Sequence, residues 1–130
     1  MADREDTFDS QLRKFRKELS AGTVALVLMA VLNRAREPLY GYQIARQLDA
    51  ADAALVAGKQ SALYPVLRNL SAAGLLESWV EPSVSGPPRR YYRITPDGRA
   101  VFGAWKSTWG RTRDFVDSML TENKQEQTDE

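Results

Sequence analysis

A proline- and glycine-rich segment at residues 82–88 constrains the fold of this chain more than any other feature. Its sequence, Pro-Ser-Val-Ser-Gly-Pro-Pro, predicts a loop, because proline and glycine interrupt regular structure. The residues on both sides fit β-strands, Leu75–Glu81 before the loop and Arg89–Thr95 after it. The sequence therefore predicts a β-hairpin. In its second strand, side chains alternate between two faces, with Tyr92 and Ile94 on one and Arg89, Tyr91 and Arg93 on the other.

Two helical patterns lie near the N-terminus. We expect residues 1–7 to be disordered, and an amphipathic helix with one narrow apolar seam to follow. Ser20–Thr23 is expected to break or cap it. The next residues, Val24–Leu32, are apolar on nearly all sides and predict a central buried helix that Pro38 ends. The seam of the first helix consists of Phe8, Leu12, Phe15 and Leu19.

Two shorter helices are predicted between Pro38 and the hairpin. In the first, the inner positions are Tyr42, Ile44, Ala45 and Leu48. Residues 49–58 fit a helix end and a loop, and a helix over Ser61–Ala73 follows, which Gly74 stops. The apolar face of this helix consists of Leu63, Val66, Leu67 and Leu70.

A long helix is predicted after the hairpin, with Thr95 as N-cap, Pro96 in the first position and Asp97 in the first turn. The fold class is therefore mainly α with a small β-hairpin, in the order of a winged helix-turn-helix. The expected parts are an N-terminal tail and amphipathic helix (1–20), a winged helix-turn-helix domain (21–95), a C-terminal helix (96–120) and a disordered acidic tail (121–130).

The chain has no cysteine and no histidine among its 130 residues. A disulfide framework, a Cys/His zinc site, a cysteine nucleophile and a Ser-His-Asp triad are therefore excluded. The acidic residues of the middle region show no spacing typical of paired catalytic carboxylates. We expect no enzyme activity, no metal and no cofactor.

The N-terminal segment Met1–Glu18 is densely charged and does not resemble a signal peptide. The longest apolar run, Val24–Leu32, is far shorter than the ~20 residues that a membrane-spanning helix needs. These features predict a cytoplasmic protein without a membrane partner.

The net charge of +1 hides an uneven distribution along the chain. Residues 21–100 contain nine basic and six acidic side chains, a balance of +3, whereas residues 121–130 carry −3. A mildly basic middle region is therefore compatible with an anionic partner.

The outward face of the predicted third helix carries side chains that suit the major groove of double-stranded DNA. Arginine and lysine pair with guanine or phosphate, and asparagine and glutamine pair with adenine. The arginines beside the Gly-Pro-Pro tip of the hairpin suit phosphates or the minor groove. The alternative for each residue is an ordinary solvated side chain. The candidate DNA-binding residues are Lys59, Gln60, Ser61, Tyr64, Arg68, Asn69, Arg89 and Arg90.

Three motifs together resemble the PadR-like transcriptional regulators. Leu39–Ala45 is similar to the second-helix motif of that family, and Leu63–Leu70 followed by Ala73–Leu76 is similar to its recognition helix and the exit from it. Arg89–Gly98 is similar to its wing strand and the start of its dimerisation helix. The single final helix is similar to the small subclass of the family.

The resemblance implies a homodimeric bacterial repressor that binds a palindromic operator and that a small molecule releases. By matching position, Tyr64 and Arg68 would contact DNA from the recognition helix, and Arg89 and Arg90 from the wing. One departure is Ala62, where relatives often carry a hydroxyl residue.

Two interpretations of the aromatic residues of the last helix stay open. Trp105 and Trp109 are four residues apart and share a helix face, so they either pack a dimer interface or clamp a small aromatic effector. The seam of the first helix predicts a second dimer element, with membrane attachment as the alternative. The candidate dimer-interface or effector residues are Trp105, Trp109, Phe102 and Phe15.

A different class of function also remains open. Winged domains can bind proteins rather than DNA, and a net charge of +1 does not exclude this. The arginines of the predicted wing favour DNA over this alternative.

Overall fold

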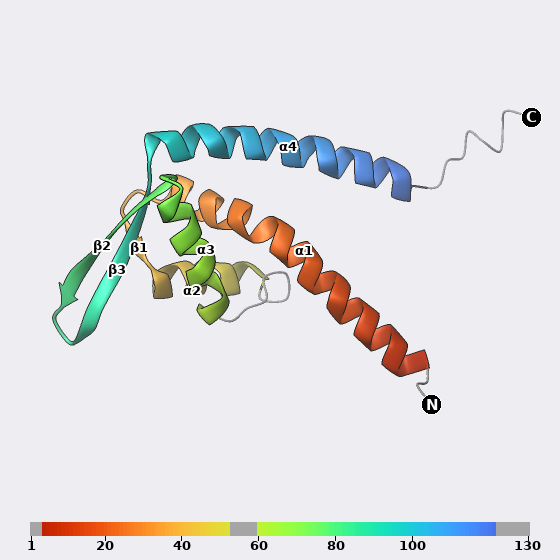
Figure 1. Cartoon of the computed structure of the whole chain (residues 1–130), viewed down its shortest axis with the longest axis horizontal. Helices are drawn as coiled ribbons and strands as arrows, with labels where there is room; N and C mark the ends of the chain where they lie inside the picture. Colours follow the sequence, from red (N-terminus) through yellow and green to blue (C-terminus); the bar gives the residue numbers. More distant parts are fainter. Residues whose placement is uncertain (1–3, 53–59, 122–130) are drawn as a thin grey trace, which may run out of the picture.

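The structure, a computed structural model, describes residues 4–52 and 60–121. Helices α1 and α4 extend from the body of the protein toward the same side and diverge, while the β2–β3 hairpin projects on the opposite side (Figure 1). Together they form a mainly helical winged helix-turn-helix, as predicted. The elements in chain order are α1 (Arg4–Arg34), β1 (Leu39–Tyr40), α2 (Gly41–Asp52), α3 (Gln60–Ala72), β2 (Leu76–Ser83), β3 (Gly86–Ile94) and α4 (Pro96–Leu120).

Helix α1 corrects two predictions about the N-terminal region. The expected break at Ser20–Thr23 is absent, and the two predicted helices form one helix of 31 residues. The Thr23 hydroxyl donates a hydrogen bond to the Leu19 carbonyl oxygen at 2.9 Å, which satisfies it inside the helix. The helix also begins at Arg4, so residues 4–7 are helical rather than disordered.

The hydrophobic core lies where α1, α2 and α3 meet the inner face of the sheet. The prediction for α2 was wrong at one position, since the Tyr42 side chain is 51% exposed while its other predicted inner residues are buried. Val66 of α3 is only half-buried. The buried apolar residues are Leu28, Met29, Val31, Leu32, Ile44, Ala45, Leu48, Leu63, Leu67, Leu70, Leu76, Tyr92 and Ile94.

The sheet has three antiparallel strands in the order β1-β3-β2, one more than the predicted hairpin. The short strand β1 places Leu39 opposite Tyr92 and Tyr40 opposite Tyr91. The predicted loop is also shorter than expected, because β2 continues to Ser83 and β3 begins at Gly86. Pro82 falls at an irregularity in the pairing of β2 with β3, a place that tolerates a residue without an N–H.

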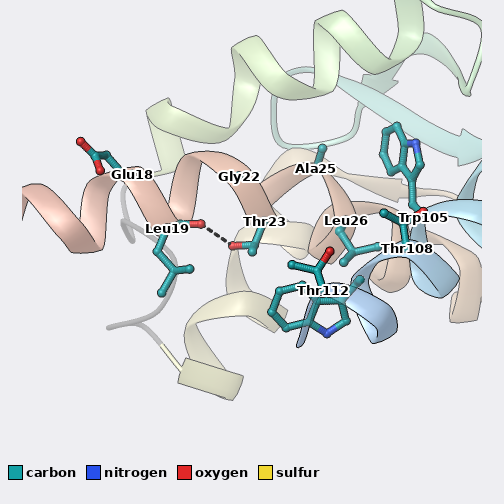
Figure 2. A pocket seen from close by; sticks show the side chains of 10 residues that line it. Glu18, Leu19, Gly22, Thr23, Ala25, Leu26, Trp105, Thr108 and Thr112 are labelled. Carbon is teal, nitrogen blue, oxygen red and sulfur yellow. Dashed lines mark hydrogen bonds between the residues drawn. The ribbon is translucent and has the colours of Figure 1, made fainter. Parts of the chain in front are cut away.

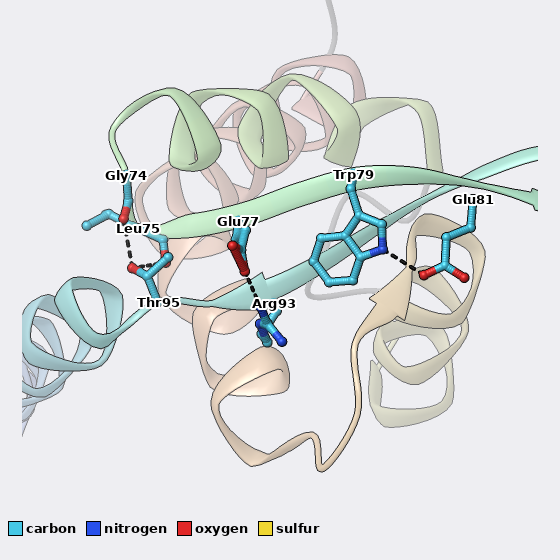
Figure 3. Close-up of polar contacts among 7 residues, drawn as sticks. All are labelled: Gly74, Leu75, Glu77, Trp79, Glu81, Arg93 and Thr95. Carbon is cyan, nitrogen blue, oxygen red and sulfur yellow. Dashed lines mark hydrogen bonds and ion pairs between the residues drawn. The ribbon is translucent and has the colours of Figure 1, made fainter.

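A compact junction joins the end of α3 to the start of α4 (Figure 3). Gly74 has a φ of +81° and ends α3, as predicted. The Thr95 hydroxyl donates to the Gly74 carbonyl oxygen at 2.7 Å and accepts from the Gly98 N–H at 2.9 Å, which confirms Thr95 as the N-cap. A Cβ at Gly98 would overlap the Leu75 carbonyl oxygen, so only glycine fits there.

We expect Gly98→Ala to lower the free energy of unfolding by about 1–3 kcal/mol, since the new methyl group must displace backbone. Gly103→Ala is a matched control in the same helix, where a Cβ would meet no described atom within 4 Å. This control should raise stability by about 0.5–1 kcal/mol, the helix propensity of alanine over glycine. Urea denaturation measures both. Equal effects of the two substitutions would contradict the close approach of α4 to Leu75.

Candidate nucleic-acid interface

Helix α3 presents a polar face on the side away from the core. Leu63, Leu67 and Leu70 are buried, and this leaves Arg68 and Asn69 exposed and Tyr64 half-buried at the boundary. The face opposite a buried stripe is the part of a recognition helix that can enter a groove. Lys59 and the side chains of Gln60 and Ser61 lie outside the described residues.

The arginines of β3 have three different surroundings. Arg90 is exposed, and its Nη1 donates to the Ser78 hydroxyl at 3.2 Å. Arg93 forms an ion pair with Glu77 and lies over the Trp79 ring, 5.3 Å from its centroid (Figure 3). Arg89 is exposed and lies over the Tyr40 ring at 4.4 Å. No ion pair of Arg89 or Arg90 is found in residues 4–52 and 60–121, although Glu81 lies opposite Arg89 in the strand pairing, whereas Arg93 is paired with Glu77.

Tyr92 marks the place where α3 and β3 meet. Burial raises the pKa of the Tyr92 hydroxyl, and Tyr64 adds to this rise. The positive charges of Arg90 and Arg68 act in the opposite direction and lower the pKa. These three residues are therefore within electrostatic reach of one buried hydroxyl. The fold brings Tyr64 of α3 and Arg90 of the wing to one surface, which Arg68 does not line.

A concave surface of about 310 Å³ lies between the hairpin tip and the start of α2. Both wing arginines line it, although strand alternation places them on opposite faces of β3. Residues from β1 and from helices α2 and α3 complete the surface. The lining residues are Tyr40, Gly41, Tyr42, Tyr64, Ser83, Ser85, Gly86, Pro87, Pro88, Arg89 and Arg90.

Eight of the eleven residues that line this concave surface were absent from the predicted site, among them Tyr40, Gly41 and Tyr42. Gly41 lets the Tyr64 ring approach the first turn of α2, because a Cβ there would stand 2.6 Å from a Tyr64 ring carbon and 2.9 Å from its hydroxyl. The sequence carried a signal for these residues in the Tyr-Gly-Tyr run, which spans the end of β1 and the first two residues of α2. This run fits a turn and a helix start equally well, so the pattern alone did not place the rings on the wing.

A second candidate site is an apolar groove between α1 and α4. It consists of two adjoining hollows of about 480 and 280 Å³, both lined by Leu19, Thr23, Leu26 and Trp109. Trp105 lines only the larger hollow, where it lies near Thr108 and Leu26 (Figure 2). Both Trp105 and Trp109 therefore line the larger hollow. Phe15 and Phe102 are not among the residues that line either hollow.

Large apolar side chains remain exposed along both helices beyond the body of the protein. Phe15 is 59% exposed, and the other residues of the α1 seam are exposed as well. The second half of α4 also carries exposed apolar side chains. The exposed apolar residues of the two helices are Phe8, Leu12, Phe15, Leu19, Trp109, Phe115, Val116, Met119 and Leu120.

No helix in the described part of the chain is long and apolar enough to cross a membrane. Among the same residues, no group of three or more carboxylates could hold a metal ion.

Comparison with known proteins identifies the family. The model of the transcriptional regulator PadR-like family matches residues 28–104. A PadR family transcriptional regulator from Eggerthella lenta has a crystal structure similar to this chain, with 32% identity, a TM-score of 0.74, and coverage of 90% of this chain and 98% of that chain.

Two further proteins are similar to this chain. A PadR-like regulator from Bacillus cereus shares the fold, with 24% identity, a TM-score of 0.66, and coverage of 82% of this chain and 99% of that one. An uncharacterized protein of Lysinibacillus sphaericus is 26% identical over 96 residues, 74% of this chain and 85% of its own length. The resemblance drawn from the three motifs is confirmed, and the chain belongs to the PadR-like family of transcriptional regulators.

Proposed function

We propose that this chain is a homodimeric, cytoplasmic repressor that binds a palindromic operator through α3 and the wing. A transcriptional regulator acts on DNA, and the observation that carries the proposal is the concave surface that Arg89 and Arg90 of the wing line together with Tyr64 of α3. Two cationic side chains and a hydroxyl from two elements then face one ligand. A DNA backbone supplies closely spaced negative charges that such a surface can neutralise.

In this proposal each element has its own contact with DNA. Arg68 pairs with guanine or phosphate from the exposed face of α3, and Asn69 pairs with adenine. The Tyr64 hydroxyl and the wing residues Arg89 and Arg90 contact phosphates, which fix the register of the helix in the groove. Lys59, Gln60 and Ser61 are proposed to contact DNA from the start of α3.

The exposed apolar seams of α1 and α4 support a homodimer. An apolar surface of this extent on a small chain is typical of an interface. A two-fold axis through such an interface would place two copies of α3 in successive major grooves, about 34–36 Å apart. This geometry explains why a palindromic operator fits the proposal.

We propose that Trp105 and Trp109 mainly pack the dimer, and that a small aromatic effector competes for the same groove. Its larger hollow, about 480 Å³, lies in the usual size range of ligand sites, roughly 300–1,000 Å³. Because these tryptophans lie on α4, an effector there would act by changing the spacing of the two recognition helices. The rival function, a winged domain that binds only proteins, predicts no salt-dependent retention on DNA or heparin.

The double variant Arg68→Ala/Arg90→Ala should bind a duplex selected from a random library by the parent protein at least about tenfold more weakly, since each such contact contributes about 1–3 kcal/mol. Its affinity should also fall less steeply with salt. Lys106→Ala/Arg111→Ala removes the same charge from exposed positions of α4 and is the control. Fluorescence anisotropy measures both. Unchanged binding by the Arg68→Ala/Arg90→Ala variant would contradict the proposed function.

Phe115→Asp should raise the dissociation constant of the homodimer at least about tenfold, because it places a carboxylate in an apolar interface where aromatic anchors contribute about 2 kcal/mol or more. The Phe115 side chain is 64% exposed in the single chain, so the substitution should leave its folding intact. Asp117→Asn is the control, since residue 117 lies on the other side of α4. Sedimentation equilibrium gives the dissociation constants. A parent chain that stays monomeric would overturn the dimer.

A further inference from the structure

Four aromatic rings form a continuous ladder on the outer face of the sheet and the start of α2. Trp79 and Tyr91 stack with centroids 6.3 Å apart, and Tyr91 meets Tyr40 edge-to-face at 5.5 Å. Tyr40 stacks in turn with Tyr42 at 6.5 Å. We call Trp79, Tyr91, Tyr40 and Tyr42 the aromatic ladder. Each ring contact has the geometry that aromatic quadrupoles favour.

Three arginines lie over rings of the aromatic ladder, and Arg89 is the closest. Its guanidinium carbon is 4.4 Å from the centroid of Tyr40, against 5.3 Å for Arg93 over Trp79 and 6.0 Å for Arg46 over Tyr42. A cation within about 6 Å of a ring face is attracted to it. Tyr40 therefore restricts a side chain that is otherwise long and flexible.

Stacking leaves the hydrogen-bonding capacity of Arg89 intact. A ring occupies the flat face of the guanidinium, whereas its five N–H donors lie in the plane and point outward. Within residues 4–52 and 60–121, Arg89 has no hydrogen bond or ion pair, unlike Arg90 with Ser78 and Arg93 with Glu77. Its donors are thus available to a ligand in the concave surface that Arg89 and Tyr40 both line.

The backbone fixes the position of Tyr40 relative to both the wing and α2. In the sheet, Tyr40 of β1 pairs with Tyr91 of β3. Its N–H donates to the Gln43 side-chain oxygen at 3.0 Å, in the first turn of α2. A ring held in this way can set the place of the Arg89 guanidinium relative to the helices.

We infer that Tyr40 is a positioning residue, whose ring holds the Arg89 guanidinium over the concave surface so that its N–H donors face a DNA phosphate. This inference rests on the proposed function. Positioning before binding matters because an arginine that is already ordered loses less side-chain freedom when it contacts the phosphate. Tyr40 itself donates nothing to the DNA in this arrangement.

The test is a double-mutant cycle of Tyr40→Leu and Arg89→Ala on the full chain, with the selected duplex as probe. Tyr40→Leu should lower affinity about three- to tenfold, the range of a cation–π contact. It should also make the association constant for DNA less sensitive to salt. The slope of its logarithm against the logarithm of the salt concentration should become shallower by up to about 0.9 for each Arg89 that no longer contacts a phosphate. In the Arg89→Ala background, Tyr40→Leu should have no further effect.

Two variants separate positioning from a general loss of structure. Tyr40→Phe keeps the ring and should bind like the parent. Trp79→Leu in a Glu81→Gln background removes a ring from the same face of the sheet without freeing the carboxylate that Trp79 holds opposite Arg89, and it should bind like Glu81→Gln alone. Additive effects in the cycle, or equal losses for Tyr40→Phe and Tyr40→Leu, would overturn the inference alone. Failure of the parent to bind DNA would overturn the proposed function and this inference with it.

Discussion

The burial of Tyr92 between the sheet and the helices is the contact on which the arrangement of the candidate interface depends. Its side chain is 2% exposed, and its strand pairs with β1 on one side and β2 on the other. Core packing at this residue therefore also sets the separation between the recognition helix and the wing. Tyr92 packs in the core on the face of β3 that also carries Arg90, so the stability of the fold and the placement of this arginine are linked.

The charge pattern explains how a chain of net charge +1 can present a basic surface. Arg93 and Glu77 balance each other across the sheet, whereas Arg89 packs on an uncharged ring and keeps its charge. The exposed cations of this surface are thus Arg89 and Arg90 on the wing and Arg68 on α3. The apolar seams of α1 and α4 lie on the other side of the body, away from the hairpin (Figure 1), so the two surfaces can serve different partners.

Patterns governed by neighbours along the chain predicted most of the fold, including the hairpin, the Gly74 stop and the Thr95 cap. Features that depend on distant contacts were missed. The helix continues through Ser20–Thr23, where the Thr23 hydroxyl bonds to the Leu19 carbonyl oxygen instead of capping a helix end. Strand β1 exists because β3 offers Leu39 and Tyr40 an edge. The three wing arginines look alike in sequence, and only their spatial neighbours distinguish Arg89 from Arg93.

The central claim is that α3 and the wing tip form a single DNA-binding surface. Titration of the isotope-labelled full chain with the selected duplex, followed by amide chemical shifts, tests it most directly. We expect the largest shifts together at Arg68 and Asn69 of α3 and at Arg89 and Arg90 of β3, with the same midpoint. Shifts confined to α1 and α4, or shifts on α3 without any on the wing, would contradict the claim.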